Sequence, residues 1–283
     1  GGTTENYHPS SGGYAPATVD WQAENADSGA NLGTRLANVG ATWDKGGYKV
    51  DSTTATFNRA AAPDGPYGSL QLGVRLVDPD GPALGGLDMN AATSGACAPS
   101  SCTARTIGAP ISVRFGVLRL DNAYGSELLP IRVPVRALYC NAATAGNCTD
   151  WRTNTDDTCT NPAANTLQIG SVTRPVGSSL AFSTPPTGVT VTQPPGQPGQ
   201  WVVTITPATR GVGSADVRFN LGGVVTTTGC PTTLTGPVGG AAPPSAIDYL
   251  AGNWCGSTYD KSATARLRFG SPRAPYIYLR ERY

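Results

Sequence analysis

The residues of this sequence whose types could do chemistry are seven cysteines, one histidine and a small number of carboxylates. None of the cysteine spacings is CxxC, which argues against a zinc ribbon or a thioredoxin-like redox site. Two short separations favour local disulfides instead, namely Cys97 to Cys102 and Cys140 to Cys148. The pairing of Cys159, Cys230 and Cys255 stays open, and the odd count leaves one thiol free, capped or bonded outside the chain. Disulfides indicate an oxidising compartment, so we expect export through the periplasm to the cell surface or the medium.

Nucleophilic catalysis has little support in this sequence. The single histidine, His8, lies in a polar Gly/Ser-rich segment, where a surface role is expected in preference to a Ser-His-Asp triad. A catalytic cysteine needs a neighbouring base that keeps it as a thiolate, and we expect six of the seven cysteines to be oxidised. We therefore expect no catalytic residue and no enzyme.

Acid–base hydrolysis is the one enzymatic class for which candidates exist, because a glycosidase needs two carboxylates facing each other across a cleft. Glu127, Asp156 and Asp157 are the candidates. The competing interpretation is that Glu127 forms an ion pair with Arg114 or Arg119. A carboxylate-dependent hydrolase is therefore the last of our alternatives.

Oxygen ligands for calcium are suggested weakly by Asp78, Asp80, Asp156 and Asp157. The segment Asp78-Pro-Asp-Gly lacks the full spacing and the distal glutamate of a calcium loop, so a plain turn is expected there. No phosphate-binding glycine motif follows a strand. We expect neither a metal nor a cofactor.

The charge balance excludes several partners. Of the 283 residues only 14% are charged, with 20 basic against 19 acidic side chains, so no field of one sign attracts nucleic acid or an anionic membrane. No segment approaches the ~18–20 consecutive apolar residues that a membrane span needs. Because the chain opens on Gly1 and not on a signal peptide, we expect a mature product or a fragment of a larger precursor.

The elements that must position these residues are predicted to be strands. Glycine and proline together make up 60 residues, 36 and 24, which suits many short strands joined by turns and long loops. Alternating apolar residues predict strands over the following ranges: 71–77, 111–120, 131–139, 201–206, 215–221, 263–269 and 276–283. A shift of parity near Gly116 suggests a bulge, and Pro134 suggests an edge strand or a bulge.

The fold class predicted is mainly β, an antiparallel β-sandwich or two packed β modules, with long loops, local disulfides and a short C-terminal helix. We divide the chain into a polar N-terminal arm over 1–34, a main β-rich region over 35–235 and a Gly/Pro-rich linker or loop over 236–244. The last part, 245–283, is predicted to be a helix-plus-hairpin unit packed on the main region. Its helix is expected from Ala246 to Ala251, with Ser245 as its N-cap.

Three blocks of sequence resemble a known family. They include Leu72-Gly-Val-Arg-Leu-Val-Asp-Pro-Asp-Gly81, the central Gly125-Ser-Glu-Leu-Leu129 and the terminal Ile277-Tyr-Leu-Arg-Glu281. Together they resemble the DUF6701 region that closes MshQ-like proteins, which are bacterial surface proteins associated with type IV pili. One departure is Cys140, since the family usually has a tryptophan after Tyr139. The resemblance implies a β-rich exported protein and supplies no catalytic residues.

We therefore expect a non-catalytic structural or adhesive component of a bacterial surface appendage, either pilus-associated or a self-assembling filament subunit. Its expected partners are copies of itself or pilus subunits, with a surface glycan or receptor as a further possibility. The alternative is a monomeric carbohydrate-binding module or adhesin, which needs an exposed aromatic platform. Trp21 and Trp151 are the residues we select to test it. Core packing is the default for the five tryptophans, which are Trp21, Trp43, Trp151, Trp201 and Trp254.

Overall fold

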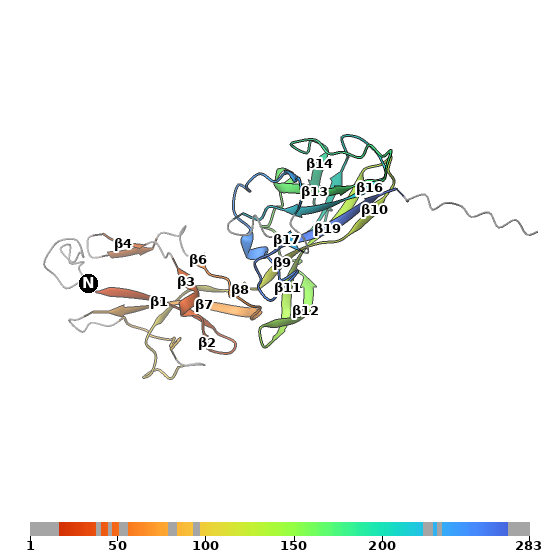
Figure 1. Cartoon of the computed structure of the whole chain (residues 1–283). Coiled ribbons are helices and arrows are strands. Elements are labelled where there is room, and N and C mark those ends of the chain that lie inside the picture. Colours follow the sequence, from red (N-terminus) through yellow and green to blue (C-terminus); the bar gives the residue numbers. More distant parts are fainter. Residues whose placement is uncertain are drawn as a thin grey trace, which may run out of the picture. The chain divides into compact units, whose positions relative to one another are not determined.

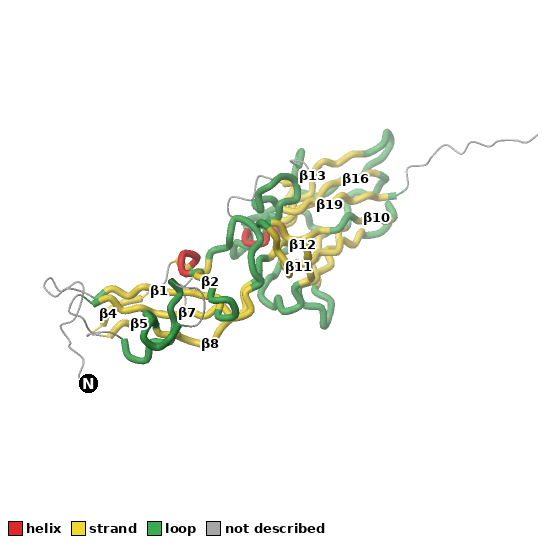
Figure 2. Tube along the Cα trace, turned by 90° about the horizontal axis from the view of Figure 1, so that it is seen from below, coloured by secondary structure: helices red, strands yellow, loops and turns green. Residues whose placement is uncertain are grey.

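The computed structural model describes the chain in segments and divides it into two compact units. The described residues are 17–37, 41–44, 47–50, 56–78, 84–92, 97–222, 229–230 and 234–270. Unit 1 comprises Gly1–Phe115 with Asn141–Cys148, and unit 2 comprises Gly116–Cys140 with Thr149–Tyr283. Strands make up 48% of the structure and helical turns 4%, as the strand-dominated tube of Figure 2 shows. The predicted mainly β class, with several antiparallel sheets, is confirmed.

Unit 1 is built on a four-stranded antiparallel sheet in the order β2-β1-β7-β8 (Figure 1). The strands are β1 (Thr18–Asn25), β2 (Ala30–Asn31), β7 (Tyr67–Val77) and β8 (Arg105–Val113). Two small antiparallel pairs accompany it, β3 (Leu36–Ala37) with β6 (Thr56–Phe57), and β4 (Ala41–Asp44) with β5 (Gly47–Val50).

Among the described residues of unit 1, the buried apolar side chains form two small groups. Ala23, Leu32 and Leu70 form one, with partly buried neighbours such as Phe57 and Tyr67 packed against it. Met89, Ala91 and Ala104 form the other. Position 73 of β7 is occupied by glycine, and a Cβ there would lie 2.4 Å from the Met89 sulfur, so a larger side chain would displace Met89.

Unit 2 contains two sheets. The first has the order β10-β19-β16-β13-β18, with β17 also paired to β19, and the second has the order β12-β11-β15-β14, with β9 also paired to β11. The pairs β10–β19 and β17–β19 are parallel, so unit 2 is not wholly antiparallel. The strands of the first sheet are β10 (Ala123–Gly125), β13 (Leu167–Thr173), β16 (Gly213–Phe219), β17 (Gly229–Cys230), β18 (Val238–Gly239) and β19 (Ser262–Phe269). Those of the second are β9 (Gly116–Leu120), β11 (Ile131–Thr144), β12 (Asn147–Thr153), β14 (Val189–Thr192) and β15 (Gln200–Ile205). Residues 141–148, which include the turn between β11 and β12, are assigned to unit 1.

One continuous core joins the two sheets of unit 2. Both contribute alternate residues to a single buried cluster, for example Val133 and Val203 from one sheet and Val217 and Leu267 from the other. Alternation of buried and exposed residues places each strand's apolar face inward, which is how the two layers of a β-sandwich pack. The sequence alternation over 131–139, 201–206 and 263–269 predicted this inward face correctly.

The predicted C-terminal helix is wrong. The segment expected to be helical from Ala246 to Ala251 contains only a 3₁₀ turn, η4 (Asp248–Leu250), among the described residues. Five or six residues are too few to repay helix nucleation unless tertiary packing selects the helix. Here Leu250 instead packs against Gly116, where a Cβ would lie 2.9 Å from a Leu250 methyl.

The structure also differs from the sequence predictions at other places. The strand predicted over 111–120 is two strands, β8 and β9, which belong to different units, and this break explains the parity shift near Gly116. Pro134 of β11 pairs with Val202 of β15. The pairing of β11 with β9 ends at Val135, so Pro134, which has no N–H, lies just beyond that ladder. Part of the expected N-terminal arm forms β1, and residues 1–16 and the predicted strand over 276–283 lie outside the described residues.

Candidate functional site

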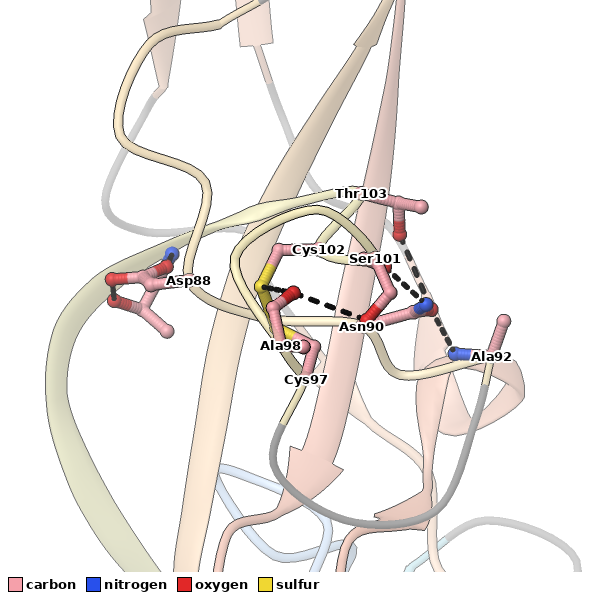
Figure 3. The surroundings of a disulfide bond; sticks show 9 residues. Asp88, Asn90, Ala92, Cys97, Ala98, Ser101, Cys102 and Thr103 are labelled. Carbon is pink, nitrogen blue, oxygen red and sulfur yellow. Dashed lines mark hydrogen bonds between the residues drawn. A yellow bond between two sulfur atoms is a disulfide. The ribbon is translucent and has the colours of Figure 1, made fainter.

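The Cys97–Cys102 disulfide closes a short loop of unit 1 whose polar groups are used within the loop (Figure 3). The Asn90 side chain donates to the Ser101 carbonyl at 2.7 Å and accepts from the Ala92 amide at 3.2 Å. Thr103 donates its hydroxyl to the same Asn90 oxygen at 3.3 Å. These contacts satisfy the Asn90 amide internally, which indicates a structural loop.

Asp88, beside this loop, is also committed to the fold. Its carboxylate accepts the Thr106 amide at 2.7 Å and the Thr106 hydroxyl at 2.8 Å. The backbone hydrogen bond, followed by the side-chain one, lowers the pKa of Asp88 below its usual value. The ionised Asp88 carboxylate therefore holds its own segment to strand β8, which contains Thr106.

The remaining cysteines divide into bonded and free. Cys140, Cys148 and Cys255 are disulfide-bonded, and two of the chain's disulfides are local. Cys159 is free and exposed. The side chain of Cys230 lies outside the described residues. Cys159 is thus the described cysteine that forms no disulfide within the chain.

The described calcium candidates are Asp78, Asp156 and Asp157. Asp157 accepts the amides of Cys159 and Thr160 at 3.2 and 2.8 Å, which makes it a turn residue. Asp156 is its exposed neighbour, Asp78 belongs to unit 1, and Asp80 lies outside the described residues. Over the described ranges, no three His, Cys, Asp or Glu side chains gather as a metal site would require.

Glu127 does not pair with Arg119, which was one of its two predicted partners. Arg119 donates its Nε to Asp121 at 3.0 Å instead. The Glu127 carboxylate lies over Gly270, where a Cβ would be 2.6 Å from Oε2. Glycine at 270 therefore leaves room for this carboxylate.

The described part of unit 2 contains a pocket of about 70 Å³. An engineered cavity of roughly 150 Å³ binds benzene, so this pocket has room for a group about half that size. It combines apolar, aromatic and polar side chains in the way small-molecule sites do. Its lining residues are Val117, Arg119, Leu138, Trp151, Gly252, Asn253 and Trp254.

The floor of the pocket is the outer face of the second sheet. In β9, Leu118 and Leu120 enter the core, so Val117 and Arg119 point to the opposite face. Leu138 of β11 lies in register with Val117, and both are buried, 7% and 2% exposed. The pocket floor is therefore apolar although it faces away from the core.

The wall of the pocket is the loop that follows η4. Gly252 and Lys261 exchange two backbone hydrogen bonds of 2.8 and 2.9 Å, which close this loop at its base. The Trp254 indole lies directly on Gly252, where a Cβ would be 2.5 Å from its Nε1. Cys255, the next residue, is disulfide-bonded. These restraints fix the position of an indole that remains 37% exposed.

The second indole of the pocket, Trp151 of β12, is held by the same loop. Its ring lies 6.5 Å from that of Tyr259, tilted by 43°. Tyr259 is only 9% exposed, so Trp151 contacts a largely buried ring. Tilted aromatic pairs at this separation are attractive beyond their buried area.

Arg119 brings a cationic group to the lining of the pocket. Asp121 accepts hydrogen bonds from both Arg119 and Arg136, so two guanidinium groups share one carboxylate. The Arg119 side chain is 50% exposed, and only its Nε is used in this pair. Its two terminal nitrogens hydrogen-bond to no other described residue. An anion at the pocket mouth would therefore meet available donors.

The aromatic platform differs from the one selected from the sequence. Trp21 lies in β1 of unit 1, whereas Trp151 lines the pocket of unit 2 with Trp254. The sequence analysis missed Arg119, Asn253 and Trp254 as site residues. The one signal in the sequence was Gly252-Asn-Trp-Cys255, a glycine and a cysteine flanking a tryptophan in a loop.

Two family models match the chain, and between them they cover nearly all of it. The DUF6701 third domain matches residues 1–104, and the DUF6701 fourth domain matches residues 114–282. The residues between the two matches, 105–113, are those of strand β8. Comparison with curated proteins and with solved structures found no match. In the described part of the chain, no helix is long and apolar enough to cross a membrane. The chain belongs to the DUF6701 family, as its third and fourth domains.

Proposed function

We propose that this chain is a non-catalytic adhesive or structural component of a bacterial surface appendage, exported to the cell exterior and associated with type IV pili. The observation that carries the proposal is the pocket of Trp151 and Trp254 on the outer face of the unit 2 sheet. A rigid sandwich that presents a restrained aromatic pocket is suited to recognising a ligand on another surface.

Export is supported by the cysteine chemistry. Disulfides in small loops persist in oxidising compartments and are rare in the bacterial cytosol. The Cys97–Cys102 bond is of this kind, and Cys255 beside the pocket is also disulfide-bonded. The pilus association rests on the resemblance to MshQ-like proteins.

Binding is favoured over hydrolysis by the chemistry of the pocket. Its seven lining residues include no carboxylate, and the nearby Asp121 is held by two arginines. A glycosidase needs a proton donor and a base or nucleophile placed across the scissile bond. The pocket supplies apolar contact, aromatic faces and cationic donors, which bind a sugar without cleaving it.

Immunogold electron microscopy of intact cells tests the proposal. We expect gold particles along surface appendages, and we expect cells lacking the gene to adhere less to surfaces that the wild type colonises. Label confined to the cell interior, or unchanged adhesion of the deletion strain, would contradict the proposal.

A second candidate, a self-assembling subunit, is favoured by the edge strand β10. Among the described strands β10 pairs only with β19. Tyr124, Leu128 and Leu129, in and just after this strand, are 65%, 59% and 64% exposed. Open edges with apolar neighbours pair readily with another chain. Light scattering should then show oligomers that a Leu128→Glu/Leu129→Glu variant turns into monomers, and a monomeric wild type would exclude this candidate.

A further inference from the structure

We propose that the pocket of unit 2 binds an acidic N-acetylated sugar, a pyranose that carries both an acetamido group and a carboxylate. This inference rests on the proposed adhesive function and names the ligand class of the same site. Three parts of the pocket carry it, and each recognises one part of such a sugar.

The first part is the size and polarity of the floor. Val117 and Leu138 are buried apolar side chains beneath a pocket of about 70 Å³. This volume is too small for a whole pyranose ring and its hydroxyls, but it suits a group of a few heavy atoms, judged against the roughly 150 Å³ that holds benzene. Transfer of an acetyl methyl from water to such a floor is favourable. Transfer of a hydroxyl is unfavourable, because the hydroxyl loses its hydrogen bonds to water.

The second part is the exposed indole of Trp254. Its position on Gly252 is fixed by the loop closure at Lys261, so little conformational entropy is lost when a ligand stacks on it. The C–H face of a pyranose is apolar and flat, and an aromatic ring with one face exposed is its natural partner. Asn253 also lines the pocket, and its amide hydrogen-bonds to no described residue, which leaves both of its polar atoms for sugar hydroxyls or the acetamido group.

The third part is the charge at the rim. Two guanidinium groups against one carboxylate leave one positive charge near Arg119. Two further ion pairs of β12 and the pocket loop, Arg152 with Asp150 and Lys261 with Asp260, are neutral as pairs. The terminal nitrogens of Arg119 form a planar fork that matches a carboxylate. A neutral sugar would leave these donors without a charged partner.

Calorimetric titration of the full chain with four sugars tests this assignment. The probes are N-acetylneuraminic acid, which has both groups, N-acetylglucosamine with only the acetamido group, glucuronic acid with only the carboxylate, and glucose with neither. We expect the first to bind tightest and the loss of each group to weaken binding by roughly tenfold. Glucose binding as tightly as N-acetylneuraminic acid, or no binding by any of the four, would overturn the ligand class.

Variants of the chain locate the binding site. Trp254→Ala and Arg119→Gln should each weaken N-acetylneuraminic acid at least about tenfold, and Arg119→Gln should leave N-acetylglucosamine unaffected. Gly252→Ala displaces the indole without removing it, so it should weaken all four sugars. Arg152→Gln, which changes an exposed arginine of the same strand as Trp151 outside the pocket, is the matched control. Unchanged affinity in a folded Trp254→Ala protein would exclude this pocket.

The outcome is separable from that of the proposed function. If gold labels the appendages and the deletion strain loses adhesion while none of the sugars binds, the adhesive function stands and the ligand class falls. If the sugars bind as expected and the protein is found only inside the cell, the ligand class stands and the surface function falls.

Discussion

The two units of this chain differ in what holds them together. Unit 2 has one continuous apolar core that joins both sheets of its sandwich. The described part of unit 1 has two groups of three buried apolar residues, around Leu70 and around Met89. Burial of apolar side chains is the dominant favourable term in folding. Unit 2 is therefore expected to be the more stable of the two, and it is the unit that carries the pocket.

Unit 1 compensates with polar and covalent ties. Arg35 pairs with Asp64 and lies over the Phe57 ring at 4.5 Å, and Tyr67 donates to the same carboxylate at 2.9 Å. Burial and the bond to Asp64 raise the pKa of Tyr67 to about 12, so its hydroxyl stays protonated as a donor. A small sheet secured by such contacts depends on each of them more than a large core depends on one residue.

The largest expected effect is a cavity in the unit 2 core. Phe219 of β16 is 1% exposed, and Phe219→Ala should lower the free energy of unfolding by about 3–5 kcal/mol. Hydrogen exchange followed over peptides of each unit should show faster exchange in unit 2. Leu128→Ala, at an exposed position of the same unit, is the control and should change little. Equal losses for both variants would show that the unit 2 core is not what stabilises it.

Removal of the Cys97–Cys102 disulfide is expected to have the next largest effect, and in unit 1. The bond closes a loop with a sequence separation of 5, and the chain-entropy model gives roughly 2 kcal/mol for so short a loop. A Cys97→Ser/Cys102→Ser variant should therefore speed exchange in the peptides of unit 1 and leave those of unit 2 unchanged. Reduction of the wild type under mild conditions provides an independent check, and acceleration confined to unit 2 would contradict the comparison.

Much of the unit 2 fold could be predicted from the sequence, because its strands are long and alternate cleanly. Ala265, Leu267 and Phe269 were expected on one face, and all three are buried in β19. Short segments were the failures. The predicted helix at 246–251 is a 3₁₀ turn, since packing of Leu250 against Gly116 decides the local conformation and not helix propensity.

The pocket was less predictable than the strands that support it. Trp151 and Trp254 are about a hundred residues apart in the sequence. The pairing of β12 and β9 with β11 and the bridge from Gly252 to Lys261 bring them to one pocket. Alternation shows which face a residue occupies, but it carries no information on which loop will cover that face.

A smaller effect is expected from a polar tie on the unit 2 sheet. Asp216 has a side chain only 4% exposed and accepts two hydrogen bonds from Arg266, at 2.8 and 2.9 Å. Asp216→Asn should lower the free energy of unfolding by about 1–2 kcal/mol, because a charge-assisted bidentate pair is lost and its arginine is half exposed. Thermal unfolding measures the change. Arg152→Gln, which breaks an exposed pair, should stay within about 0.5 kcal/mol of the wild type, and a larger loss there would indicate that exposure does not decide the difference.

The smallest effect is expected from replacing Glu24 of unit 1, and the replacement should raise the stability of the unit. Glu24 is 9% exposed, and its Oε2 accepts no hydrogen bond from any described residue. Burial raises the pKa of this carboxyl above its ordinary value of 4.5, so the folded state binds the proton more tightly than the unfolded state does. The stability of unit 1 must then fall as the pH rises from the ordinary pKa through the raised one. The cost of the buried charge is absent at lower pH and fully present above that window.

Replacing the carboxyl by an amide removes this pH dependence. Glu24→Gln should raise the unfolding temperature of unit 1 at about pH 7 and leave it unchanged at about pH 3.5, where the wild-type side chain is already neutral. Calorimetric scans of both proteins at the two pH values measure the difference. A Glu24→Gln protein that is less stable at neutral pH would show that the charge is paired, and it would place Glu24 with Asp64 among the polar ties that hold unit 1 together.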